Sequence, residues 1–118
     1  MKYIKKLLIL GFHSANLILI TFYLYPGSIF GYILYRNSSI QPQLTRDFII
    51  SSNHLYAFIV LSTLGIVAYQ NTKKIKFIIV YLFFLSIILE LFHLIIPNRR
   101  FEMSDLFGNI IGVILVII

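Results

Sequence analysis

Long hydrophobic runs, separated by short polar segments, dominate the chain. These runs lie near residues 5–25, 53–70, 76–96 and 104–118. A helix needs about 20 residues to cross a hydrocarbon core roughly 30 Å thick, and the first three runs are about that long. The fourth is shorter, because the stretch from Leu106 to Ile118 forms only about 20 Å of helix. The pattern predicts an all-α integral membrane protein with a four-helix bundle.

The composition agrees with this class. Of the 118 residues, 59% are hydrophobic and 12% are charged, which is far from the balance of a soluble domain. We therefore expect a single membrane domain over residues 1–118. The start, MKYIKKLLILGF, resembles a secretory signal, but FYLYPGS offers no small-x-small cleavage site, so we expect this helix to be retained. The absence of cysteine excludes disulfides and thiolate metal sites.

Lysines and arginines occupy different connections along the chain. The lysines precede the first run or lie between the second and third, at Lys2, Lys5, Lys6, Lys73, Lys74 and Lys76. The arginines lie in the other two connections, at Arg36, Arg46, Arg99 and Arg100. The positive-inside rule then predicts cytoplasmic termini, N-in and C-in. The net charge of +6 is split between segment ends, so we expect no nucleic-acid partner.

The longest polar stretch joins the first and second runs. Pro26 and Gly27 end the first helix, because proline removes a hydrogen-bond donor and glycine tolerates the turn. The segment SIFGYILY that follows is too short to span a membrane. We expect it to lie along the membrane surface, with Tyr32 and Tyr35 at headgroup level.

Two of the runs carry a stripe of polar or helix-breaking residues. In the third run these are Ser86, Glu90, His93 and Pro97, and in the fourth they are Asp105, Asn109 and Gly112. Residues three and four apart lie on one helix face, and the short connection makes the two helices antiparallel neighbours. A charged residue facing lipid costs about 2.5 to 3.5 kcal/mol or more, so we expect Glu90 to face inward and to have a partner.

The connection between these two runs carries the paired arginines. The fourth run is too short to span the whole hydrocarbon core. If its C-terminal end reaches the cytoplasmic surface, Asp105 at its other end lies deeper than the outer headgroups, and we expect Arg99 or Arg100 to pair with it. Asp105 also lies at the helix start, where its charge complements the dipole and its oxygens can cap free N–H groups. Paired arginines also suit phosphate or carboxylate recognition. The alternative is that the arginines only hold the loop, and that the stripes only hold the helices together.

Polar residues outside the stripes have simpler interpretations. Glu90, His93 and Asp105 are expected near the outer surface of the membrane, and we call them the outer cluster. His13 and Asn16 lie too deep in the membrane to reach this cluster, and we expect them to make interhelical hydrogen bonds. Asn53, His54 and Tyr56 open the second run on the outer side. Helix capping and interface anchoring account for all three, and His54 can also join the outer cluster.

Several chemistries are tested against these residues. Glu90 and His93 form a Glu-x-x-His pattern, but a di-iron site needs a second copy and further glutamates, which the chain lacks. A zinc ion held by His93, Asp105 and His54 is geometrically conceivable but not favoured, so we expect no metal and no cofactor. Glu90 with His93 or Asp105 could act as an acid/base pair, although no nucleophile is evident beside them. An enzyme is therefore the less favoured interpretation.

The segment ELFHLIIPNRRFEMSDLFGNIIG, residues 90–112, resembles the signature of the VanZ-like family, small four-helix membrane proteins named for a teicoplanin-resistance protein. The family pattern has Glu, Gln three residues later, and then Pro, Arg, Asp, Asn and Gly at set distances. The residues that fall on it are Glu90, Pro97, Arg99, Asp105, Asn109 and Gly112. His93 stands in place of the Gln, which keeps a hydrogen-bonding side chain and adds a titratable one.

The family's other motif, about Asp-Lys-x-x-His-x-x-x-Tyr leading into Leu-Gly, is poorly kept in SSNHLYAFIVLSTLG. Aligned through Leu64-Gly65, this segment has Asn53, His54, Ala57 and Leu61 in the four motif positions. A shifted register lets His54 fill the family's His position but loses Leu-Gly. An activity that depends on this His would fall to His93 or His54.

The resemblance implies a role in the bacterial cell envelope, with lowered sensitivity to teicoplanin-type antibiotics in some members. We expect a multi-pass protein of the bacterial cell membrane whose outward cleft binds an envelope component. The expected ligand-binding residues are Glu90, His93, Arg99, Arg100, Asp105, Asn109 and His54. Expected partners are membrane lipids, an anionic envelope lipid or a lipid-linked peptidoglycan precursor. The alternatives are a structural membrane subunit, or an enzyme on a lipid-linked or phospholipid substrate with Glu90, His93 and Asp105 as candidate catalytic residues.

Overall fold

The computed structural model describes residues 2–43, 45–47, 50–97 and 99–118. Over these residues the chain forms five helices and no strand, which confirms the all-helical class. The helices are α1 (Lys2–Leu24), α2 (Ile29–Tyr35), α3 (Ser52–Tyr69), α4 (Ile75–Phe92) and α5 (Met103–Ile117). The first, third and fourth are long and apolar enough to cross a membrane, whereas α5 is a shorter apolar helix of 15 residues.

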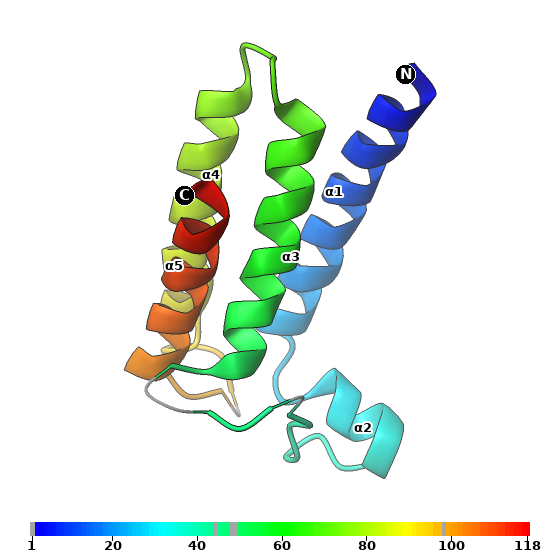
Figure 1. Cartoon of the computed structure of the whole chain (residues 1–118). Helices are drawn as coiled ribbons and strands as arrows, with labels where there is room; N and C mark the ends of the chain where they lie inside the picture. The colour runs from blue at the N-terminus through cyan, green and yellow to red at the C-terminus, as the bar shows by residue number, and fades with distance from the viewer. Residues whose placement is uncertain (1, 44, 48–49, 98) are drawn as a thin grey trace.

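Helices α1, α3, α4 and α5 run alternately in opposite directions, as Figure 1 shows. The N-terminus and the α3–α4 turn lie at one end, while α2 and the α4–α5 connection lie at the other. Helix α3 contacts α1, α4 and α5, and its contacts with α5 and α1 are the most extensive between the helices. The lysine-bearing segments therefore share one end of the molecule, and the arginine-bearing connections share the opposite end.

The interior and the exterior of this helical assembly are both apolar. The core includes Phe12, Phe58, Leu61, Leu82, Leu89 and Val113. Large apolar side chains also face outward on the long helices, including Leu7, Leu17, Phe77 and Phe84, each at least 60% exposed. Helices that are apolar on all sides are typical of membrane spans, because lipid can solvate the outer face.

Two glycines allow α5 to approach α3 closely. A Cβ atom at Gly108 would lie 2.8 Å from the Ser51 carbonyl oxygen, and one at Gly112 would lie 2.8 Å from both the Leu55 carbonyl oxygen and the Phe58 Cβ. Small residues spaced four apart are a common means of close packing between membrane helices. The close approach brings the polar stripe of α5 against the start of α3.

Gly112→Ala should lower the free energy of unfolding by about 1 to 3 kcal/mol, because the added methyl group overpacks the α3–α5 contact. Gly11→Ala in α1 is the matched control, since nothing lies within 4 Å of the added Cβ. It should be neutral or stabilising by up to about 1 kcal/mol, owing to the higher helix propensity of alanine. Thermal unfolding in detergent measures both variants, and equal stability of the two would contradict the proposed close packing.

Helix α4 ends at Phe92, so the prediction that it extends to residue 96 is wrong. Beyond this residue the backbone tightens, with His93 N–H donating to the Glu90 carbonyl at 3.0 Å and Leu94 N–H donating to the Leu91 carbonyl at 3.1 Å. Proline disfavours helical geometry in the residue before it and lacks an N–H donor, which accounts for the early end. Pro97 itself is exposed and does not continue the polar stripe.

The segment after Pro26 forms helix α2, which has 7 residues and is too short to span a membrane, as predicted. Ser28 caps this helix by accepting the Gly31 N–H at 3.0 Å. Tyr32 and Tyr35 are each 59% exposed, and their placement at headgroup level stays a prediction.

Candidate functional site

A group of polar side chains from α1, α3, α4 and α5 meets at the end of the molecule that carries α2. We call this group the polar cluster. Its members are Tyr23, His54, Glu90, His93, Asp105 and Asn109. The cluster brings together five of the seven predicted ligand-binding residues, and the meeting of the two predicted stripes is confirmed.

Glu90 is fully buried and faces the interior, as predicted. Its Oε1 accepts the backbone N–H of Glu102 at 3.2 Å and lies 3.2 Å from His93 Nδ1. Its Oε2 is also buried, and among the described residues it has no hydrogen-bond partner. The Nδ1 of His54 lies 3.9 Å from this oxygen, beyond hydrogen-bond length. One half of this carboxylate is therefore satisfied and the other half is not.

His93 has both ring nitrogens engaged. Nε2 lies 2.9 Å from the carbonyl oxygen of Tyr23, which can only accept, so Nε2 carries a proton. Nδ1 shares a proton with Glu90 Oε1, and the ring stacks on Tyr23 with centroids 5.8 Å apart. His93 therefore connects the end of α4 to α1 and presents no free nitrogen to a ligand.

Asn109 determines which nitrogen of His54 is protonated. Its Nδ2 donates to the Ser86 carbonyl oxygen at 3.0 Å, which orients the amide so that Oδ1 accepts from the Tyr23 hydroxyl at 2.6 Å. His54 Nδ1 lies 2.8 Å from that hydroxyl oxygen and 2.9 Å from Asn109 Oδ1. Both can only accept, because the single hydroxyl hydrogen is already donated. Nδ1 therefore carries the proton, and Nε2 of the neutral ring carries a lone pair.

Asp105 lies in the first turn of α5, half-buried, with Oδ2 3.7 Å from His54 Nε2. Glu102, and not Asp105, occupies the N-cap position, and its side chain makes no capping hydrogen bond. The expected pairing of Asp105 with Arg99 or Arg100 is wrong. Within the described ranges, the ion-pair contacts of Asp105 involve His54 alone. The carboxylate thus faces the cluster.

Arg99 instead caps the C-terminal end of α1. Its Nε donates to the Tyr25 carbonyl at 3.0 Å, and Nη2 donates to the Phe22 carbonyl. A cation at the C-terminal end of a helix satisfies free carbonyl groups and complements the dipole. Partial burial lowers the pKa of Arg99, and the acidic groups of the polar cluster oppose this shift. A guanidinium group stays protonated at neutral pH, so Arg99 remains a cation.

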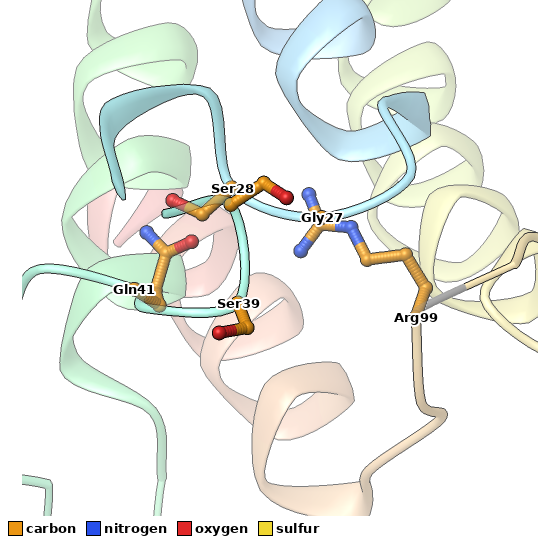
Figure 2. Close-up of a pocket in the computed structure, with 6 residues that line it drawn as sticks. Gly27, Ser28, Ser39, Gln41 and Arg99 are labelled. Atoms are coloured by element: carbon orange, nitrogen blue, oxygen red, sulfur yellow. The ribbon is translucent and has the colours of Figure 1, made fainter. Parts of the chain in front are cut away.

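A pocket of about 460 Å³ opens beside Arg99. Figure 2 shows the Arg99 side chain reaching from the α4–α5 connection toward Gly27 and Ser28, with Ser39 and Gln41 on the facing loop. The residues that line the pocket are Gly27, Ser28, Ser38, Ser39, Gln41 and Arg99. We call this space the Arg99 pocket. Arg100 is exposed and does not line it, so the structure separates the two arginines.

The interhelical hydrogen bonds predicted for His13 and Asn16 are confirmed, whereas the helix capping predicted for Asn53, His54 and Tyr56 is wrong, because Ser51 is the N-cap of α3. His13 Nε2 lies 2.8 Å from the Tyr69 hydroxyl, and Asn16 Oδ1 accepts from Tyr81 at 2.7 Å. Asn53 donates to the Pro42 carbonyl at 2.7 Å, and this bond anchors the preceding loop to α3.

Tyr23 is the member of the cluster that the sequence patterns missed. A tyrosine at the end of an apolar run usually indicates an interface anchor, so it carried no distinguishing signal. Its spacing of seven residues from Asn16 puts it on the polar face of α1, which is the one signal that could have revealed it. The pocket residues of the α1–α3 connection were likewise not predicted, because loop proximity has no periodic signature.

Fold and site together define an all-helical protein with helices of membrane length around a buried cluster of ionisable groups. The VanZ/LLP1 family model matches residues 10–118, nearly the whole chain, so the protein belongs to this family. No curated protein and no solved structure gives a significant match. The family resemblance predicted from residues 90–112 is therefore confirmed.

Proposed function

We propose that this protein binds the anionic, phosphate-bearing headgroup of a cell-envelope component in the Arg99 pocket. It does so as a multi-pass protein of the bacterial cell membrane, with cytoplasmic termini and the pocket on the outer side. The separation of lysines and arginines to opposite ends supports this orientation. The cleft predicted from Glu90, His93, Arg99, Asp105 and Asn109 is accordingly narrowed to the space beside Arg99.

The fixed guanidinium of Arg99 carries this proposal. Arginine has five N–H donors, and two of them are held by α1 carbonyl groups. The remaining donors adjoin a pocket whose other polar groups are serine hydroxyls and the Gln41 amide. No acidic side chain lines the pocket among the described residues. Such a site favours phosphate or carboxylate, which guanidinium binds in a two-pronged way.

The polar cluster is a poor site for an anion. Glu90 and Asp105 would repel a second negative group, and Glu90, His93 and Asn109 are buried. The Arg99 pocket is open and has the opposite charge. Anionic phospholipids and lipid-linked peptidoglycan precursors both present phosphate at the membrane surface, and they are the ligand classes that fit. Binding them would connect the protein to glycopeptide sensitivity.

A cysteine at position 39 reports on both the orientation and the ligand, because the chain has no other cysteine. Ser39→Cys in intact cells should react with a membrane-impermeant maleimide if the pocket faces outward. In phosphatidylcholine nanodiscs, short-chain phosphatidic acid or an isoprenyl diphosphate should slow this reaction. Inorganic phosphate in a separate arm distinguishes free phosphate from a lipid headgroup.

The ligand's slowing of the maleimide reaction measures its binding and is called protection. Arg99→Ala in the Ser39→Cys background should raise the ligand concentration needed for protection about tenfold or more, since a hydrogen bond to a charged group contributes about 1.5 to 3 kcal/mol. Arg100→Ala is the matched control, because it removes the same charge one residue away from an exposed side chain. Equal loss in the two variants would show general charge attraction and would sink the proposal. Protection that survives Arg99→Ala, or labelling only in broken cells, would do the same.

A further inference from the structure

We propose that His54, Glu90 and Asp105 form a binding site for a divalent metal ion, and that this ion is Zn²⁺. This inference does not rest on the function proposed for the Arg99 pocket. The three residues come from α3, α4 and α5 and each offers one ligand atom, all within 4.8 Å of one another. Zinc bonds of about 2.0 to 2.2 Å place tetrahedral ligand atoms roughly 3.3 Å apart. The distance of 3.7 Å between His54 Nε2 and Asp105 Oδ2 needs only a small contraction.

His54 is already in the protonation state that a metal ligand requires. Its Nδ1–H is directed at the Tyr23 and Asn109 oxygens, so the Nε2 lone pair faces Asp105. Metal-bound histidines commonly donate their other ring N–H to a protein oxygen, which fixes the ring orientation. Here the bond from Asn109 to the Ser86 carbonyl extends that support to the backbone of α4.

A second observation supports the site: Oε2 of Glu90 is fully buried and has no hydrogen-bond partner among the residues that the structure describes. A buried carboxylate oxygen without a partner is costly, and Glu90 here lies near a second carboxylate and the imidazole ring of His54. The gaps of 3.9 Å to His54 Nδ1 and 3.7 Å from His54 Nε2 to Asp105 exceed hydrogen-bond length. A proton therefore does not bridge these groups well, whereas a cation between them satisfies all three.

The nearby side chains of Arg99 and His93 are engaged elsewhere. Arg99 donates to the carbonyl groups at the end of α1, and His93 is held between Tyr23 and Glu90 Oε1. The ligand set thus differs from the zinc arrangement considered from the sequence, because Glu90 takes the place of His93. One imidazole and two carboxylates, with a position left for water, is a donor set that zinc accepts.

The test uses the full chain without a histidine tag, purified in detergent, stripped with a chelator and dialysed against Zn²⁺ in the absence of anionic lipid. Elemental analysis should find one zinc per chain. His54→Gln and Asp105→Asn should each weaken binding by more than about tenfold, since even residues that only support a metal ligand cost that much. His13→Gln is the matched control, because His13 lies outside the polar cluster and pairs with Tyr69. It should bind zinc like the wild type.

Circular dichroism and size-exclusion profiles show which variants remain folded. Asp105→Asn keeps the test decisive if His54→Gln does not fold, because the Asp105 side chain is only partly buried. Substitution with Co²⁺ should give the visible absorption of a four-coordinate site in the wild type and lose it in Asp105→Asn. Zinc binding that is absent in the wild type, or unchanged in Asp105→Asn, would overturn the site. A preference for Mg²⁺ or Mn²⁺ over Zn²⁺ would overturn the choice of ion. Because no anionic lipid is present, failure here leaves the Arg99 pocket untouched.

Discussion

Glu90→Ala should lower the free energy of unfolding by about 3 to 5 kcal/mol, the usual cost of removing one partner from a buried charged pair. Glu90 Oε1 is the acceptor for the Glu102 N–H and the partner of His93 Nδ1, and the side chains of Glu90 and His93 are both buried. Alanine leaves both groups without a partner and adds a cavity. Thermal unfolding in detergent, with a chelator present so that no metal contributes, measures the loss.

Glu102→Ala is the control for this substitution. Its carboxylate is exposed, and the N–H that Glu90 accepts belongs to the backbone, so the contact survives. The change should remain within about 0.5 kcal/mol. Glu90→Gln should fall between the two, because it keeps an acceptor oxygen but loses the charge. A Glu90→Ala protein as stable as Glu102→Ala would refute the buried pairing of Glu90.

Asn109→Leu should cost about 2 to 4 kcal/mol, judged from about 1 to 3 kcal/mol for each buried polar group that loses its partner. Asn109 is fully buried and connects α5 to three other helices, since it accepts from Tyr23 of α1, contacts His54 of α3 and donates to Ser86 of α4. Leucine has nearly the same volume but no polar atoms. The loss should therefore come from hydrogen bonding more than from packing.

Asn16→Leu provides the comparison, because Asn16 is only partly buried and has Tyr81 as its hydrogen-bond partner. Denaturation in detergent should show a smaller loss there, about 1 kcal/mol. Equal effects of the two substitutions would mean that Asn109 does not organise the cluster.

Residues 86–93 show what local patterns can predict. Ser86, Glu90 and His93 lie on one face of α4 because of the helical repeat, and Glu90 faces inward because lipid does not tolerate its charge. Both arguments need only the neighbouring residues. The predicted pairing of Arg99 with Asp105 was wrong, because the groups that Arg99 contacts lie far from it in the sequence. Asp105 is near it in sequence, but the end of α1, some 75 residues earlier, offers carbonyl groups that the guanidinium reaches instead.

Sequence alone determined the helices of membrane length, the opposite placement of lysines and arginines and the membership of the family, because hydrophobicity, charge and short motifs are local properties. Tertiary structure alone decided that Tyr23 joins the polar cluster, that His54 lies within 4 Å of both the Glu90 and Asp105 carboxylates, and that Arg99 borders a pocket. These features depend on the close approach of α5 to α3 at Gly108 and Gly112 and on the position of α1. Such contacts join segments far apart in the chain, and no periodic pattern records them.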